Sequence, residues 1–295
     1  MVMRRVAVVG AGLMGHGIAQ CAAQAGYAVQ LWGIGDAELA GARARIAESV
    51  AKLHAKGKIA DPPAAVLARL QTTTEMADLA GADLYIETVV ERIEVKHDIF
   101  RRLDDLAPPP ALIASNTSTI PIGRLAAVVR HPERCLGIHF TSPVPLMPVA
   151  EIIRAPKTDP AVFETAVAFV RSLGKEVIRV EKDVAGFVFN RVNLPSTVEA
   201  IRLVEMGAAG VEDIDKAMRL GFGRPMGPFE TADMVGLDTG YFALSALWRE
   251  TGEEKFRPPE LLRRKVEAGQ LGRKAGRGWY VYDGDGARIG IAPLP

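Results

Sequence analysis

A histidine and a glutamate twelve residues apart form the pair best suited to proton transfer. His139 ends an apolar run in Gly137-Ile-His-Phe140, and Glu151 follows after a loop rich in proline. A loop of this length lets the chain reverse, so the carboxylate can return to the imidazole, orient it and stabilise its protonated form. A histidine beside an apolar strand can also be structural, and these two residues by themselves leave both interpretations open.

A glycine-rich turn near the N-terminus has the spacing of a dinucleotide-binding motif. Gly10-Ala-Gly12-Leu-Met-Gly15 follows an apolar run and opens a helix-forming segment. The first glycine permits a tight turn, the second lets the backbone approach a pyrophosphate, and the third allows close packing of helix on strand. Because a helix N-terminus also presents N–H donors, the motif predicts binding of a dinucleotide.

The acidic residue that usually binds the adenosine ribose is missing from its place. It should end the second strand, but Gly33 follows Val29-Gln-Leu-Trp32, and the nearest carboxylate is that of Asp36. Asp36 can reach the ribose or cap the helix expected from Ala37, and capping is favoured. Since positions 33–36 hold no arginine for a 2′-phosphate, we expect NAD rather than NADP.

Further polar groups follow the third and fourth predicted strands, at the edge where parallel sheets place ligands. The segment 114–119, Ala-Ser-Asn-Thr-Ser-Thr, can hold a ligand or cap the next helix. Glu91 and Lys96 are charged residues of a predicted loop, and by default they would be solvated.

Short β-branched runs alternate with helix-period segments in the first part of the chain. We expect strands at 5–9, 28–32, 83–87, 111–115, 135–139, 149–153 and 176–180. This pattern predicts an α/β fold, a Rossmann-type doubly wound and mostly parallel sheet, over residues 1–183. Residues 184–295 form a second domain of helix-period segments with no convincing strand until 279–282.

The crossover over 36–70 is about twice the usual length, and we expect an extra helical hairpin there. Ser49, Lys52 and Lys56 fall on one face of its helix. That face is either merely solvated or a docking surface for phosphates.

Composition excludes several classes of protein. With 295 residues, 48% hydrophobic content and a net charge of +1, the chain can bury a core but has no global field for nucleic acid or an anionic membrane. Its apolar runs are far shorter than the roughly 20 residues of a membrane span. Cys21 and Cys135 lack metal-ligand spacing, so we expect buried thiols, no metal and a reducing cytoplasm.

Six motifs, in order, resemble those of the L-3-hydroxyacyl-CoA dehydrogenase family, close to its bacterial 3-hydroxybutyryl-CoA members, over nearly the whole chain. They are Gly10-Ala-Gly-Leu-Met-Gly-His-Gly-Ile-Ala19, Ser115-Asn-Thr-Ser118, Gly137-Ile-His-Phe140 with Pro143-Val-Pro-Leu-Met147, Gly186-Phe-Val-Phe-Asn-Arg191, Pro225-Met-Gly-Pro-Phe-Glu230 and Leu271-Gly-Arg-Lys-Ala-Gly-Arg-Gly-Trp-Tyr280. The resemblance implies an NAD-binding Rossmann domain, an all-helical second domain that forms a homodimer, and oxidation of a 3-hydroxyacyl-CoA to the 3-ketoacyl-CoA.

The resemblance also implies roles for single residues. His139 would be the general base with Glu151 as its partner, and Ser118 and Asn190 would contact the substrate near the reacting oxygen. The positions implied at the cofactor site are Gly10, Gly12, Leu13, Met14, Gly15, Gly33, Asp36, Glu91, Lys96, Asn116, Ser118, Ser142 and Lys274. Ser49 and Lys56 would meet coenzyme A.

Two positions depart from the family pattern. Gly33 replaces an aspartate, which removes a charge-assisted bond to the ribose hydroxyls. Thr141-Ser142 stands where the family has Phe-Asn, which leaves room for a dehydrogenase of a free 3-hydroxy carboxylate, of the carnitine or gulonate type. Ser49 and Lys56 favour the thioester, while His139 and Glu151 argue against a third alternative, a non-catalytic NADH-binding protein.

Overall fold

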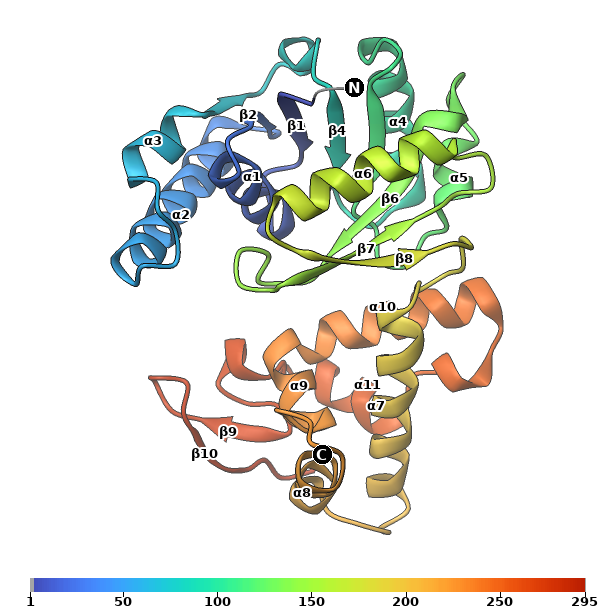
Figure 1. The fold of residues 1–295 in the computed structure, drawn as a ribbon. Helices are drawn as coiled ribbons and strands as arrows, with labels where there is room; N and C mark the ends of the chain where they lie inside the picture. The colour runs from blue at the N-terminus through green and yellow to red at the C-terminus, as the bar shows by residue number, and fades with distance from the viewer. Residues whose placement is uncertain (1–2, 295) are drawn as a thin grey trace. The chain divides into compact units, whose positions relative to one another are not determined.

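The computed structural model describes residues 3–294 and divides into two compact units that meet between Phe187 and Val188. Figure 1 shows both. The sequence places the domain boundary at 183/184, and that boundary stays a prediction.

The first unit is built on an eight-stranded, mostly parallel sheet. Its strands are β1 (Arg5–Val9), β2 (Ala28–Trp32), β3 (Leu70–Thr73), β4 (Leu84–Glu87), β5 (Leu112–Ser115), β6 (Cys135–Phe140), β7 (Val149–Ile153) and β8 (Glu176–Val180). They lie in the order β3-β2-β1-β4-β5-β6-β7-β8, and β7 and β8 run opposite to the other six. The doubly wound order is confirmed, and it reverses between β1 and β4, where such folds bind ligands.

Helices cover both faces of this sheet (Figure 1). They are α1 (Leu13–Gln24), α2 (Asp36–Ala55), α3 (Pro63–Ala68), α4 (Ile93–Leu106), α5 (Ile122–Ala126) and α6 (Pro160–Ser172), with the short 3-10 helices η1 (Met76–Leu79) and η2 (Pro132–Arg134). One apolar core joins the sheet to α1, α2, α3 and α6, and includes Ile18 and Phe163. A second core joins the other face to α4 and α5 through Phe100 and Leu125.

Strand β1 shows why the central strands have continuously apolar sequences. Val6 and Val8 belong to the core beneath α1, whereas Ala7 and Val9 belong to the core beneath α4. Successive side chains of a strand point to opposite faces, and both faces are covered here, so all four residues from Val6 to Val9 are buried, and only Arg5 at the start of the strand is exposed.

The long crossover contains the helical hairpin that the sequence predicts, formed by α2 and α3. It then adds strand β3, which was not expected from the sequence. This edge strand, Leu-Gln-Thr-Thr, has one buried residue, Leu70. A single apolar residue gives no alternating pattern, which explains the omission.

The second unit is helical and carries a small hairpin in addition. Its elements are α7 (Phe189–Glu205), α8 (Val211–Phe222), α9 (Pro228–Val235), α10 (Leu237–Thr251), η3 (Glu254–Phe256), α11 (Glu260–Glu267), η4 (Arg273–Ala275), β9 (Tyr280–Tyr282) and β10 (Arg288–Ile291). Strand β9 lies where the sequence predicts a strand. Strand β10 was not predicted, since all four of its residues are exposed.

Two buried aspartates anchor this hairpin to the helices. The Asp233 carboxylate accepts hydrogen bonds from the backbone N–H groups of Trp279, at 2.8 Å, and Tyr280, at 2.9 Å. The Asp215 carboxylate accepts from the Tyr280 hydroxyl at 2.8 Å. A Cβ atom at Gly278 would lie 2.0 Å from Asp233 Oδ1, so only glycine leaves room for this carboxylate.

Both cysteines are free thiols in apolar surroundings. Burial raises the pKa of Cys21 to about 11 and that of Cys135 to about 12, which confirms the expected buried thiols. None of the helices in residues 3–294 combines the length and apolar character needed to cross a membrane.

Candidate active site

The histidine and glutamate singled out in the sequence face each other across two strands. β6 and β7 are antiparallel, and their register pairs His139 with Glu151. The His139 Nδ1 atom lies 2.6 Å from Glu151 Oε2, both residues are buried, and the Phe187 ring lies 5.8 Å from the imidazole. The loop between the strands therefore reverses the chain as predicted and brings the carboxylate to the ring.

The glycine-rich turn has the geometry of a pyrophosphate cradle. It leads from β1 into α1, whose N-cap is Gly12 and whose first turn holds no acidic residue. A Cβ atom at Gly15 would lie 1.7 Å from the Gly10 carbonyl oxygen, so this glycine is required for the helix to pack against the turn. A Cβ atom at Gly12 would meet nothing within 4 Å. The turn therefore fits a dinucleotide, because its backbone is open at the helix N-terminus.

A buried ion pair lies at the carboxyl end of β4. Lys96 lies in α4, not in a loop, and its Nζ atom is 2.7 Å from Glu87 Oε1 and 3.2 Å from Glu91 Oε2. Side-chain exposure is 1% for Lys96 and 0% for Glu87, so the expectation that Lys96 is solvated is wrong. Burial by itself would lower the pKa of Lys96, but attraction to Glu87 and Glu91 outweighs it and raises the pKa.

Glu91 organises the polar segment that follows β5. Its Oε1 atom accepts hydrogen bonds from Thr117 Oγ1 at 2.5 Å, from the Ser118 N–H at 3.1 Å and from Thr119 Oγ1 at 3.0 Å. Asn116 Oδ1 accepts from the Phe140 N–H at 2.9 Å, which ties this segment to the end of β6 beside His139. The expected polar cluster therefore lies at the carboxyl ends of the strands.

The polar segment 114–119 does not cap the next helix, so the capping interpretation of this segment is wrong. Helix α5 begins at Ile122 after Pro121, which makes no side-chain cap bond. The carboxylate of Asp183 instead accepts from the N–H groups of Ile122, at 3.0 Å, and Gly123, at 2.7 Å. The sequence offered no signal for this cap, because Asp183 lies 61 residues beyond Ile122.

The residues considered for coenzyme A differ in their surroundings. Gln20 Nε2 donates to Ser49 Oγ at 3.0 Å, and Lys52 forms an exposed ion pair with Glu48 at 2.5 Å. Lys56 is exposed at the C-cap of α2, and within residues 3–294 its ammonium has no ion-pair partner. Lys56 is thus the better placed of the two lysines to meet a phosphate.

The predicted role of Asp36 as a helix cap is wrong. Helix α2 begins at Asp36 itself, its N-cap is Gly35, and no side chain caps it. Glu38 instead reaches back, and its Oε2 atom accepts from the Ile34 N–H at 3.0 Å. Glu38 could not be found from the sequence, because nothing in the pattern distinguishes it from other surface residues of the helix.

The loop after β6 holds both residues of the second departure. Ser142 is exposed, and Thr141 Oγ1 is buried with no hydrogen-bond partner in the described part of the chain. This loop follows His139 directly, so its side chains can influence what binds there.

Two further candidates belong to the second unit. Asn190 lies in the first turn of α7 and is partly exposed. Lys274 lies in η4, and its Nζ atom contacts both carboxylate oxygens of Asp238, at 2.6 and 2.7 Å.

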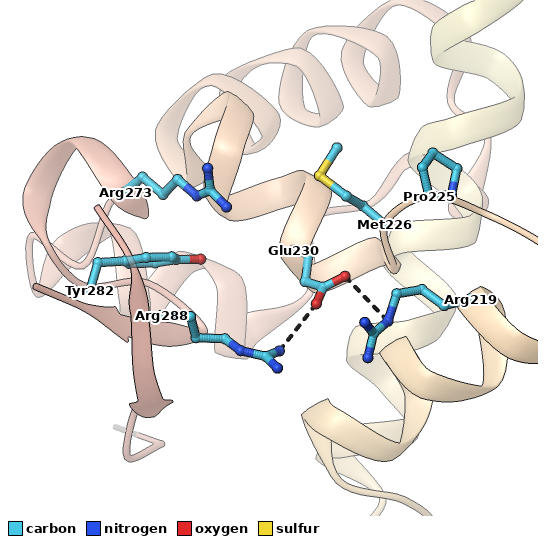
Figure 2. Close-up of a pocket in the computed structure, with 7 residues that line it drawn as sticks. All are labelled: Arg219, Pro225, Met226, Glu230, Arg273, Tyr282 and Arg288. Atoms are coloured by element: carbon cyan, nitrogen blue, oxygen red, sulfur yellow. Dashed lines mark hydrogen bonds and ion pairs between the residues drawn. The ribbon is translucent and has the colours of Figure 1, made fainter. Parts of the chain in front are cut away.

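The second unit also contains a cavity of about 240 Å³ with arginine side chains in its wall (Figure 2). Its lining residues are Arg219, Pro225, Met226, Glu230, Arg273, Tyr282 and Arg288. Glu230 pairs with Arg288 at 3.1 Å and with Arg219 at 3.6 Å, as the dashed lines in Figure 2 mark. The motif that ends at Glu230 therefore helps to hold this unit together.

Both units match known protein families. Residues 5–184 match the family model described as "3-hydroxyacyl-CoA dehydrogenase, NAD binding domain", and residues 186–282 match "3-hydroxyacyl-CoA dehydrogenase, C-terminal domain".

Individual relatives agree over nearly the whole chain. The 3-hydroxybutyryl-CoA dehydrogenase of Bradyrhizobium diazoefficiens is 45% identical and covers 96% of this chain and 97% of its own. A probable 3-hydroxybutyryl-CoA dehydrogenase of Deinococcus radiodurans is 42% identical over 93% of this chain and 99% of its own. The crystal structure of (S)-3-hydroxybutyryl-CoA dehydrogenase from Ralstonia eutropha superposes with a TM-score of 0.89 at 41% identity, covering 96% of this chain and 100% of its own.

Proposed function

The chain belongs to the 3-hydroxyacyl-CoA dehydrogenase family, and on that premise we propose that it transfers a hydride between NAD and a 3-hydroxyacyl-CoA of the 3-hydroxybutyryl type. It is an NAD-dependent dehydrogenase, and its product is the 3-ketoacyl-CoA. The observation that carries the proposal is the 2.6 Å contact between His139 and Glu151, in the same sheet that carries the glycine cradle.

His139 acts as the general base. The Nδ1 atom contacts Glu151, so Nε2 is the ring nitrogen that would exchange a proton with the substrate's 3-hydroxyl. The buried carboxylate fixes the orientation of the ring and stabilises the imidazolium that forms. When bound, NAD accepts the hydride that leaves C3 of the substrate, while the protein contributes position and charge.

The cofactor would be held mainly by backbone groups. The turn from Gly10 to Gly15, with Leu13 and Met14, would bind the pyrophosphate at the N-terminus of α1. The further positions that we assign to the cofactor are Gly33, Glu91, Lys96, Asn116, Ser118, Ser142 and Lys274, whereas Asp36, the other position implied by the sequence, is not assigned to it. Of these, Lys96 would act through Glu91, because its ammonium is buried in their ion pair.

Four residues are assigned to the substrate. Ser118 and Asn190 would contact the substrate near the reacting oxygen, and Ser49 and Lys56 would meet coenzyme A. The exposed ammonium of Lys56 supports this assignment. A homodimer formed through the second unit and a cytoplasmic location complete the proposal, and the exposed Phe222 and Phe242 side chains of that unit favour the dimer.

A second candidate function is oxidation of a free 3-hydroxy carboxylate. It is favoured by the loop after β6, where Thr141 has a buried hydroxyl without a hydrogen-bond partner among residues 3–294. A small carboxylate substrate could use that donor.

Reduction of acetoacetyl-CoA and of free acetoacetate, followed by loss of NADH absorbance, tests both candidates. We expect turnover of the thioester and little of the free acid. Faster turnover of the free acid would favour the second candidate. Stoichiometric NADH binding without turnover of either substrate would support a non-catalytic NADH-binding protein.

A further inference from the structure

The end of β2 carries a carboxylate that comes from the following helix. Glu38 lies in the first turn of α2, and its side chain folds back so that Oε2 accepts from the Ile34 N–H at 3.0 Å. The side chain is partly exposed, and within residues 3–294 its Oε1 atom makes no hydrogen bond. The carboxylate therefore keeps acceptor capacity for a ligand.

This carboxylate fills the place of the missing side chain at position 33. A Cβ atom at Gly33 would lie 2.9 Å from Glu38 Oε2 and 2.9 Å from Leu39 Cδ2. A side chain at position 33 would therefore have to displace the Glu38 carboxylate and the end of the Leu39 side chain. A negative charge is thus present at the end of β2, although the residue at its end has no side chain.

The same strand end adjoins the glycine cradle. The N–H of Gly10 donates to the Trp32 carbonyl oxygen at 2.9 Å, so the last residue of β2 is bonded directly to the first residue of the turn. A dinucleotide bound along that turn would present its adenosine ribose to the end of β2. Glu38 is therefore at the position from which the ribose is recognised.

We propose that Glu38 supplies the ribose-binding carboxylate of this chain, and this inference rests on the proposed function. Its free oxygen would accept from the ribose hydroxyls of NAD, and its charge would repel the 2′-phosphate of NADP. We assign the role to Glu38 and not to Asp36, because Glu38 is held at the end of β2 by its bond to Ile34, whereas Asp36 is exposed at the first position of α2 and makes no such bond among residues 3–294.

Glu38 also has a structural role, since it accepts the Ile34 N–H in the first turn of a helix. Glu38→Gln separates the two roles, because the amide oxygen can still accept from Ile34 while the charge is lost. Asp36→Asn is the matched control, as it removes one negative charge two positions away.

Dissociation constants of NADH and NADPH, measured by fluorescence titration of wild type and both variants, test the proposal. We expect wild type to bind NADH more tightly than NADPH. Glu38→Gln should reduce the ratio of the two dissociation constants by about 10- to 100-fold, which corresponds to the loss of one hydrogen bond to a charged group. In Asp36→Asn the same ratio should stay within about twofold of the wild-type value, because most surface substitutions have small effects. An unchanged preference in Glu38→Gln, or its loss in Asp36→Asn, would overturn the proposal.

Exchange of the acid between the two positions gives a second test. Gly33→Asp alone should bind NADH no better than wild type, because the new carboxylate would have to displace that of Glu38, and one acid would then replace the other. Gly33→Asp combined with Glu38→Ala should regain the NADH preference that Glu38→Ala loses. A single Gly33→Asp variant with sharply improved preference would show that Glu38 does not fill the site. If wild type binds neither cofactor, the proposed function fails as well, whereas normal NADH binding with an unchanged preference overturns only the role of Glu38.

Discussion

His139 lies directly opposite Glu151 in the register of β6 and β7, with 2.6 Å between Nδ1 and Oε2. Both partners stand on strands of one sheet, so the pair is preorganised by the fold and needs no loop movement to form.

We predict that His139→Gln binds NADH nearly as wild type does but loses about 100- to 10,000-fold in turnover, the usual cost of removing a general base. Glu151→Gln should show a smaller loss of the same kind. Steady-state rates with 3-hydroxybutyryl-CoA and NADH titrations measure the two effects separately. A His139→Gln rate within about threefold of wild type would contradict the assignment, because proton transfer could not depend on the ring.

Lys56→Ala should raise the KM for acetoacetyl-CoA by about two- to fivefold, the range of an exposed ion pair. The KM for the N-acetylcysteamine thioester should not change, because that analogue carries no phosphate. Lys52→Ala is the matched control, since Lys52 is already paired with Glu48. Equal effects of Lys56→Ala on both substrates would show that Lys56 does not recognise the phosphates of coenzyme A.

Lys96→Met should lower the free energy of unfolding by about 3–5 kcal/mol, because it leaves Glu87 buried without its cation. Denaturant unfolding measures this loss. Lys96→Met with Glu87→Met should recover much of the stability, since no charge is then left buried. A single variant as stable as wild type would show that the pair adds nothing to folding.

A buried pair far from the site gives a pH-dependent prediction. Asp104 and Arg134, each 4% exposed, lie 2.8 Å apart. Burial by itself raises the pKa of Asp104, but hydrogen bonds from Arg130 and Arg134 outweigh it and lower the pKa to about 2. The stability from this group is therefore present above its ordinary value of 3.8 and is lost as the pH falls toward about 2.

Asp104→Asn should consequently destabilise the protein by about 3 kcal/mol near neutral pH. The difference from wild type should shrink by about 2 kcal/mol as the pH falls from 3.8 to about 2. Urea unfolding at several pH values measures it. A difference that is constant over this range would mean that the carboxylate charge contributes no stability.

The sequence predicted the strands whose residues form a continuous β-branched or apolar run, including β8 at the edge of the sheet. The bounds expected for β1, β2, β7 and β8 agree with the structure residue for residue, because apolar runs and turn residues mark them. The edge strands β3 and β10 gave no pattern, since each is short and mostly in contact with solvent.

The candidate site was predictable where the chemistry depends on local spacing. The glycine turn and the approach of Glu151 to His139 both follow from short stretches of chain. Glu87 was missed because a carboxylate that ends an apolar strand shows its role only through a lysine on the next helix. Asp36 was misassigned because α2 begins one residue earlier than expected, which puts Asp36 inside the helix.

The two buried aspartates of the second unit also constrain how this chain can evolve. A Cβ atom at Gly278 would lie 2.0 Å from Asp233 Oδ1, and one at Gly227 would lie 2.2 Å from Asp215 Oδ1. Neither glycine can therefore gain a side chain while the aspartate opposite keeps its place. Loss of the acid would not free either glycine, because a Cβ atom at Gly227 would also lie 2.4 Å from the Asp215 Cα atom and one at Gly278 would lie 2.6 Å from the Gly272 Cα atom, so a descendant with a side chain there must also move its backbone.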